Sequence, residues 1–479
     1  MTLPDTGRSA PSLRLLAVAY ALLAAALLAL YWFPEPKLLA GDENHYHNTA
    51  MAILAGGDWF DHNLLWPPLQ GLFLAGVYAI AGPSILPAQL LQLLMLAGGG
   101  LLLADTLDRL GVDRATSRWT SALLCVNPLS VGFATYLWPE IQHLVLSLFL
   151  AWCLVRARQA AGRAQLAWSA GAGVALGLCL LSKSLLTGFW PLLLLPLWRR
   201  QERARSAGRA VVFLLAALLV TAPALQRGFQ LTGKPQIADS SWFNLWVGLQ
   251  DRWRGDFVFD VTGEHMREYL LSSEDPRERN AFARARALAI VAERGPVATL
   301  AGQLGKQYFR LFDARHFVVS QLAGEVCAGY KQHYRGDGIL VNRGAAWLLQ
   351  AWHVGLLVLA AFGIAAWRGW RRPWLWLVLA FVAYQLALFA GLHVKTRFLL
   401  PMLPVLCLFA GHWLAHARRP TAAGTALALA FGVLALGGPW LDRACETQAG
   451  RSGSVGDGTA AAPAPRSSCT TSLKPDRAA

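Results

Sequence analysis

The chain alternates long apolar runs with short polar stretches, and the lengths of the apolar runs predict helices that cross a membrane. A helix of about 20 residues covers the roughly 30 Å of hydrocarbon, because each residue adds about 1.5 Å. We therefore expect an all-α polytopic membrane protein with about eleven crossings. The expected crossings are residues 15–33, 84–104, 210–225, 346–367, 374–392, 398–415 and 421–436, with two more in each of the ranges 119–155 and 164–198.

One apolar run, residues 64–82, is too short to cross comfortably, because a helix from Pro68 to Gly82 would be only about 21 Å long. Three arginine clusters mark expected cytoplasmic loops, at residues 109–118, 156–163 and 199–209. If the N-terminus is also inside, an even number of crossings must precede Arg109, and the first two full-length runs supply two. We therefore expect residues 68–81 to form a juxtamembrane or re-entrant helix on the outer side.

This pattern predicts one membrane domain over residues 1–440, with a first outer loop at about 34–83 and a long outer polar region at about 226–345. Residues 441–479 are rich in glycine, serine, alanine and proline without an apolar pattern, which predicts a disordered outer tail. A cleaved signal peptide is the alternative for the first run, since Ala24-Ala25-Ala26 resembles a cleavage site, but the run is rather long for one.

Composition agrees with a membrane protein, because 55% of the 479 residues are hydrophobic and only 15% are charged. The net charge of +15 would suggest a nucleic-acid partner in a soluble protein. Here most arginines lie in short clusters between apolar runs, so the charge indicates topology and no nucleic-acid partner is expected. Of the seven cysteines, Cys327, Cys445 and Cys469 lie in polar segments, and a disulfide among them stays open.

Charged and aromatic residues recur where the expected topology places the outer face. The motifs are Gly41-Asp42-Glu43-Asn44-His45-Tyr46-His47, Tyr136-Leu137-Trp138-Pro139-Glu140, Leu181-Ser182-Lys183-Ser184 and His393-Val394-Lys395-Thr396-Arg397, beside the region 226–345. Acids in two short loops and bases in two others predict a pocket suited to a phosphate leaving group and a hydroxyl nucleophile.

Each candidate also has a structural interpretation. Asp42 is suited to a helix N-cap and Glu140 to a first helical turn, while Lys183 and Arg397 are suited to snorkelling at helix ends. The pair His45 and His47 would meet a metal only if the chain were extended there, because on a helix their side chains diverge. No cofactor is therefore assigned, and a divalent cation stays open.

Taken in order, several of these motifs resemble the GT-C glycosyltransferases over roughly residues 13–415. The motifs are Asp42-Glu43, Pro67-Pro68-Leu69, Trp138-Pro139-Glu140, Ser182-Lys183, Arg294-Gly295-Pro296, Lys306-x-x-x-Arg310 and Arg397-Phe398-Leu399-Leu400-Pro401-x-Leu403-Pro404. The set is more narrowly similar to the branch of protein mannosyltransferases and aminoarabinose transferases, which use dolichyl- or undecaprenyl-phosphate sugars. In two respects the chain departs from that branch. Trp66 stands where many aminoarabinose relatives carry a lysine that contacts the phosphate, and the region 226–345 has no recognisable added domain.

The resemblance implies transfer of a sugar from a polyprenyl-phosphate donor to a lipid, glycan or protein acceptor at the outer face. It implies catalytic roles for Asp42 and Glu140, and the adjacent Glu43 is a further catalytic candidate. A departing phosphate needs cations or hydrogen bonds to stabilise it, so Lys183, Lys395 and Arg397 are the candidates for donor-phosphate binding. Further candidates for substrate binding are His45, Tyr46, His62, His393 and Trp242. For Trp242 the alternative is a place in an interfacial belt.

Two other functions remain open at this stage. A flippase or carrier of lipid-linked sugars would use similar loops, but should line a path through the bilayer with polar residues. A catalytically inactive glycan-binding relative would account for the missing lysine before Pro67. The alanine-, arginine- and glycine-rich composition suggests a bacterium with a GC-rich genome, and therefore the inner membrane, a cytoplasmic N-terminus and a periplasmic site. The sequence leaves the sugar, the acceptor, metal dependence and the oligomeric state open.

Overall fold

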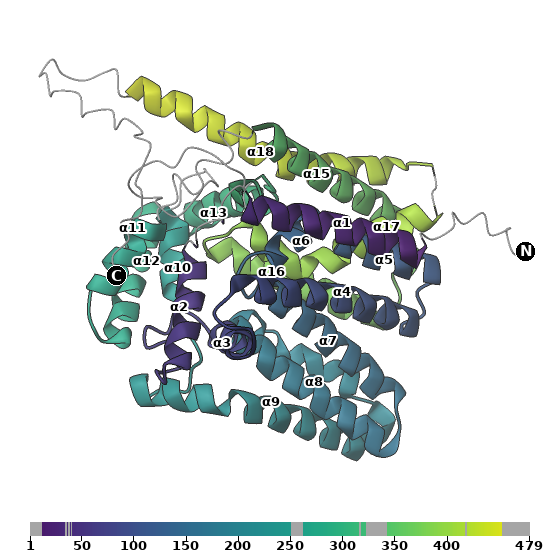
Figure 1. Cartoon of the computed structure of the whole chain (residues 1–479). Helices are drawn as coiled ribbons and strands as arrows, with labels where there is room; N and C mark the ends of the chain where they lie inside the picture. The colour runs from purple at the N-terminus through teal and green to yellow at the C-terminus, as the bar shows by residue number, and fades with distance from the viewer. Residues whose placement is uncertain are drawn as a thin grey trace, which may run out of the picture.

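The computed structural model describes residues 12–33, 36, 39, 41–250, 262–315, 318–321, 343–416 and 419–452, and the regular elements there are helices (Figure 1). The first half contains α1 (Leu13–Trp32), α2 (Asp42–Leu54), α3 (Leu69–Ala81), α4 (Ile85–Arg109), α5 (Arg114–Cys125), α6 (Pro128–Ala134), α7 (Glu140–Gln159), α8 (Gly162–Ser182), the 3-10 helices η1 (Ser184–Leu186), η2 (Trp190–Leu197) and η3 (Arg200–Glu202), and α9 (Arg203–Thr232). The second half contains α10 (Ser241–Gln250), α11 (Thr262–Leu271), α12 (Pro276–Arg294), α13 (Pro296–Leu311), η5 (Val319–Gln321), α15 (Arg343–Ala366), α16 (Pro373–Gly391), η6 (Thr396–Met402), α17 (Leu403–His416) and α18 (Ala422–Ser452).

Among the described residues, 8 helices are long and apolar enough to cross a membrane, so the all-helical, multi-pass expectation is confirmed. They are α1, α4, α7, α8, η3 with α9, α15, α16, and η6 with α17. The predicted count of eleven crossings is not confirmed, because the three remaining segments are interrupted or short. These segments are α5 with α6, η1 with η2, and the apolar part of α18, Ala422–Gly438.

The interruption between α5 and α6 has a local cause. Pro128 lacks the N–H that would continue the hydrogen bonds of α5, and Asn127 accepts a hydrogen bond from the backbone N–H of Leu129 at 2.9 Å. Asn127 therefore caps a new helix instead of continuing the old one. In the same way, Pro191 and Pro196 accompany the 3-10 geometry of η2.

The arginine-rich loops meet at one end of the bundle, which we call the arginine-rich end. Hydrogen bonds there join Arg109 to Gln159, Arg158 to the carbonyl of Pro196, Arg372 to the carbonyl of Gly111, and His416 to Asp113. The loops at the opposite end, called the pocket end below, hold Asp42, Glu140, Lys183 and Arg397.

Helix α3 is oriented differently from the long helices. Figure 1 shows α3 along its axis, whereas α4, α7, α8 and α9 run across the view. Its 13 residues span only about 20 Å. A Cβ on Gly71 would lie 2.8 Å from Thr49, so α3 packs closely on α2 at the pocket end. That residues 68–81 do not cross the membrane stays a prediction.

Helices α10 to α13 cover the pocket end. Asp275 caps α12, and Gly295, with φ of 81°, separates α12 from α13, which begins at Pro296. Phe243, Trp246 and Tyr269 form part of a small core there. Near the C-terminus α18 continues to Ser452, past residue 440, and the remainder of the expected tail lies outside the described residues, as do Cys327 and Cys469.

Candidate functional site

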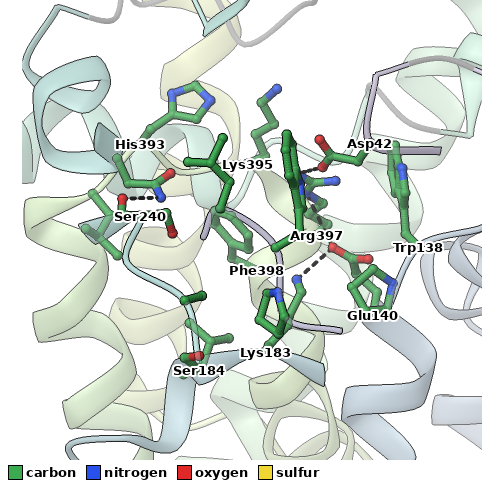
Figure 2. A pocket seen from close by; sticks show the side chains of 18 of the residues that line it. Asp42, Trp138, Glu140, Lys183, Ser184, Ser240, His393, Lys395, Arg397 and Phe398 are labelled. Carbon is green, nitrogen blue, oxygen red and sulfur yellow. Dashed lines mark hydrogen bonds and ion pairs between the residues drawn. The ribbon is translucent and has the colours of Figure 1, made fainter. Parts of the chain in front are cut away.

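A cavity of about 620 Å³ lies at the pocket end of the bundle (Figure 2). It is lined by the start of α2, the turns that precede α3 and α7, the turn after α8, the start of α10 and the segment from α16 to η6. Eight of the residues predicted from the sequence as candidates line it. They are Asp42, His45, Tyr46, Glu140, Lys183, His393, Lys395 and Arg397.

Asp42 is the first residue of α2 and faces the cavity. The N-cap position is taken by Gly41, whose φ of 54° suits glycine, and no side chain caps the helix there. The structural interpretation of Asp42 as an N-cap is therefore wrong. Instead, a carboxylate oxygen of Asp42 accepts a hydrogen bond at 2.7 Å from the Arg397 guanidinium, 355 residues away along the chain.

Glu140 begins α7 directly after Pro139, and its side chain is only 1% exposed. One carboxylate oxygen lies 2.7 Å from Nζ of Lys183 and 3.4 Å from Nε of Arg397. The other oxygen is buried and has no hydrogen-bond partner among the described residues. Glu140 therefore holds two cations at the edge of the cavity and keeps spare hydrogen-bonding capacity.

The two cations also lie over aromatic rings. The Arg397 guanidinium carbon is 4.6 Å from the ring centre of Trp138, and Nζ of Lys183 is 5.0 Å from that of Phe398. Lys183 has an extended backbone conformation between α8 and η1. The direction of its side chain is therefore not set by either helix. Ion pairs and cation–π contacts together fix the positions of both charges.

The protonation states follow from burial and from these neighbours. Burial alone would raise the pKa of Asp42, but Arg397, and less strongly Lys395, hold the pKa of this carboxyl below its ordinary 3.8. Burial lowers the pKa of Lys183 below 10.5, although Glu140 opposes that change. Burial also lowers the pKa of His45 and raises that of Tyr46 well above 10. At neutral pH Asp42 is thus ionised, whereas His45 and Tyr46 are uncharged.

The remaining walls of the cavity are apolar or aromatic. Leu388, Phe389 and Leu392 contribute an apolar wall from the end of α16. On the side of the first loop, the ring of His45 stacks on Trp66 with 3.9 Å between ring centres. The backbone N–H of Trp66 donates to Asp61 at 3.0 Å, which fixes the turn that carries this ring.

Three predicted site residues do not line the cavity. Glu43 is fully buried and accepts a hydrogen bond from the backbone N–H of Leu137 at 3.2 Å, so it supports the turn before Glu140. His62 is exposed and lies 2.8 Å from Asp58. Trp242 lies under the Arg284 guanidinium, 5.5 Å away, and is not among the residues that line the cavity.

The structure also adds residues that the sequence analysis did not select. Trp66 and Trp138 line the cavity, although the sequence analysis gave neither a role in the site. Trp138 belongs to a selected motif and Trp66 precedes one, so their aromatic rings next to charged residues were a usable signal. Asn244 also lines it and accepts a backbone hydrogen bond from His393 at 3.0 Å through its carbonyl. Asn244 lies in the long polar region, where no motif marked it.

The His45 and His47 pair does not form a metal site. Both lie on α2, where they diverge, and His47 is hydrogen-bonded to the hydroxyl of Tyr78 at 3.0 Å. A group with suitable ligand spacing within the described residues consists of Asp113, His412 and His416, at the arginine-rich end.

No protein-family model and no curated protein sequence matches the chain. Solved structures of GT-C glycosyltransferases match it at low identity. The protein O-mannosyltransferase complex Pmt1-Pmt2 of S. cerevisiae, bound to its sugar donor, is 17% identical over 50% of this chain, with a TM-score of 0.36. The archaeal oligosaccharyltransferase AglB from Archaeoglobus fulgidus is 14% identical over 89%, with a TM-score of 0.45. ArnT from Cupriavidus metallidurans, bound to undecaprenyl phosphate, is 17% identical over 89%, with a TM-score of 0.38.

The chain spans 37% of the first of these proteins, 55% of the second and 78% of the third. All three TM-scores are below 0.5, so the functional argument below rests on the cavity and its residues. The class that fold and cavity define is a multi-pass helical membrane protein with a charged cavity at one end of its bundle.

Proposed function

We propose that this chain is an integral-membrane glycosyltransferase that moves a sugar from a polyprenyl-phosphate donor to a hydroxyl of a lipid, glycan or protein acceptor. One observation carries the proposal. The carboxylate of Asp42 and the cations Lys183 and Arg397 face the same cavity, and that cavity has an apolar wall from α16. A base for the acceptor, charges for a phosphate and a surface for a hydrocarbon chain are thereby within reach of one another.

The charges favour departure of the phosphate. The cavity is lined by three lysine or arginine side chains and two acidic side chains, which leaves one excess positive charge. They are Lys183, Lys395, Arg397, Asp42 and Glu140. A sugar phosphodiester carries one negative charge, whereas the polyprenyl monophosphate that leaves carries more. The cations therefore stabilise the leaving group more strongly than the bound donor, which is the condition for lowering the barrier.

Asp42 is proposed to receive the acceptor proton. As the acceptor oxygen bonds to the anomeric carbon, the bond from that carbon to the phosphate oxygen breaks, and the hydroxyl proton passes to the carboxylate. Arg397 holds Asp42 at 2.7 Å and makes it a weak base while the cavity contains no donor. A phosphate bound by Arg397 would compete with Asp42 for the guanidinium, which would raise the basicity of Asp42 when the donor is present.

The aromatic side of the cavity suits a sugar ring. Trp66, whose ring stacks on His45, offers an aromatic surface for the C–H groups of a pyranose. Trp138 is buried between the Tyr136 ring and the Arg397 guanidinium, so it supports the cation beside that surface. Because Trp66 stands where many aminoarabinose transferases have a phosphate-binding lysine, we assign the phosphate to Lys183 and Arg397. With tryptophan at this position, the phosphate subsite depends on Lys183 and Arg397.

The orientation is also part of the proposal. Arginine-rich loops remain on the cytoplasmic side of a membrane. If the arginine-rich end faces the cytoplasm, the cavity opens on the outer side, which is the periplasmic side of a bacterial inner membrane. A donor would enter from the bilayer along the apolar wall, and an acceptor would enter from the aqueous side.

The test is a transfer assay with purified protein in proteoliposomes. A panel of labelled polyprenyl-phosphate sugars is supplied with membrane extract as the acceptor source, and both released polyprenyl phosphate and labelled acceptor are measured. We expect one class of donor to be consumed by the wild type and not by Asp42→Asn. Donor binding or translocation without release of polyprenyl phosphate for any donor would contradict the proposal and favour a carrier or a glycan-binding protein.

A further inference from the structure

A second group of polar side chains lies at the arginine-rich end, far from the cavity. Asp113 precedes α5, and His412 and His416 lie on the last turns of α17. One ligand atom from each residue lies within 4.8 Å of the other two, and Nε2 of His416 is 3.1 Å from a carboxylate oxygen of Asp113. The three residues come from segments about 300 positions apart in the chain.

The spacing of the histidines suits metal binding. Residues four apart on a helix share one face, the arrangement by which helical His-x-x-x-His pairs bind zinc. The rings of His412 and His416 lie 4.7 Å apart between centres. Ligands around a tetrahedral zinc are roughly 3.4 Å apart at zinc–nitrogen distances near 2.0–2.1 Å. The observed spacing therefore requires only small side-chain rotations.

The carboxylate is held in a suitable orientation by a separate contact. One oxygen of Asp113 accepts a hydrogen bond from the backbone N–H of Thr116 at 2.9 Å and so caps α5. The other oxygen is the one that faces His416. Outer contacts of this kind fix the direction of a metal ligand before the metal arrives. The Asp113 side chain is 45% exposed and that of His416 31%, so an ion has an aqueous route to the group.

We propose that Asp113, His412 and His416 bind a first-row divalent transition metal ion, with Zn²⁺ as the best match to two imidazoles and one carboxylate. Three protein ligands leave a fourth position for water. The ion joins the start of α5 to the end of α17. Helix α17 continues from η6, which carries Arg397, and α5 leads through α6 to the turn before Glu140. The ion would therefore join two helices whose neighbouring segments line the cavity.

The experiment uses the full chain, purified in detergent without a polyhistidine tag and without donor or acceptor. Co²⁺ is titrated at low ratios and followed by its visible absorption, and Zn²⁺ is then added in competition. We expect about one Co²⁺ to bind per chain and to be displaced by Zn²⁺. The midpoint temperature of thermal unfolding should rise when Zn²⁺ is added. His412→Ala with His416→Ala should lose both the absorption and the thermal shift.

A matched control is available at the pocket end, where Asp58 and His62 form a carboxylate–imidazole pair at 2.8 Å. His62→Ala should retain the full Co²⁺ signal. If the double variant unfolds, His416→Gln alone still removes a ligand at a partly exposed position and should weaken Zn²⁺ binding at least about tenfold. Equal metal binding by the wild type and the histidine variants, or no Co²⁺ absorption in the wild type, would overturn the proposal and leave His416 and Asp113 as a simple ion pair.

Discussion

Ion pairs occur at both ends of the bundle, but their surroundings differ. At the pocket end, the side chains of Glu140, Lys183 and Arg397 are 1%, 16% and 14% exposed, and they converge on a cavity. At the arginine-rich end, Arg109 and Asp105 form a pair that is 31% and 44% exposed, and Arg209 is buried beside Glu202. None of these four residues lines the cavity.

This difference separates charges that a ligand would use from charges that set topology. The free energy needed to remove charged groups from water can exceed the free energy gained when they pair. A buried charged cluster is therefore poor evidence for stability. Exposed pairs cost little and contribute little. On the proposed function, the convergence of Asp42, Arg397, Glu140 and Lys183 provides a binding site for a charged substrate.

The sidedness of the two ends predicts an all-or-none result. His62→Cys and Ser84→Cys, which flank α3, should both react with a membrane-impermeant thiol reagent added from outside, in a background without reactive native cysteines. His62 is a better position than Asp61, because Asp61 accepts backbone hydrogen bonds from Leu65 and Trp66. As a control, Arg163→Cys should react only from the cytoplasmic side. Labelling of Ser84→Cys from the cytoplasmic side alone would show that α3 crosses.

Removing the Lys183 side chain should weaken donor binding. Lys183→Ala should lower the affinity for undecaprenyl phosphate roughly 10- to 100-fold, because it removes a charge-assisted contact to the phosphate. Lys234→Ala is the matched control, since Lys234 is exposed at the same end and does not line the cavity. Binding is measured by titration in nanodiscs. Equal affinity in the two variants would remove Lys183 from the phosphate site.

Donor affinity should also depend on pH through Lys183. Burial lowers the pKa of this lysine below its ordinary 10.5, so its positive charge is lost as pH rises through that lowered pKa. The affinity for undecaprenyl phosphate should accordingly fall before pH 10.5 is reached. In Lys183→Arg the side chain stays charged, and the fall should disappear from this range. A wild-type affinity that stays constant up to pH 10.5 would argue against the role of Lys183.

The smallest effect is expected at the arginine-rich end. Asp105→Asn breaks an exposed pair with Arg109 but retains a hydrogen-bond acceptor for Trp152. The free energy of unfolding should change by less than about 1 kcal/mol, and donor affinity should be unchanged. Thermal unfolding and the undecaprenyl phosphate titration measure the two quantities. A marked loss of donor affinity would show that the two ends are coupled.

The sequence predicted the helical, multi-pass fold because long apolar runs leave few alternatives in a membrane. It did not predict the break at Asn127 and Pro128 or the 3-10 geometry of η2, because local caps and prolines are weak signals inside apolar runs. The requirement for an even number of crossings between cytoplasmic segments predicted that the charged loops of the pocket end lie on the same side. The rotation of α2 about its axis decides that Asp42 pairs with Arg397 and that the adjacent Glu43 is buried. No local sequence pattern determines that rotation.

The most direct test of the account is the single-turnover rate of Asp42→Asn. Asparagine keeps the shape and an oxygen for Arg397, and Gly41 occupies the N-cap, so folding and donor affinity should be retained. The rate of sugar transfer should fall roughly a hundredfold or more, the scale of a lost general base. Glu43→Gln, which keeps the acceptor for the Leu137 N–H, should lose much less. An Asp42→Asn variant that retains most of the wild-type rate would contradict the central claim and transfer the role of base to Glu140.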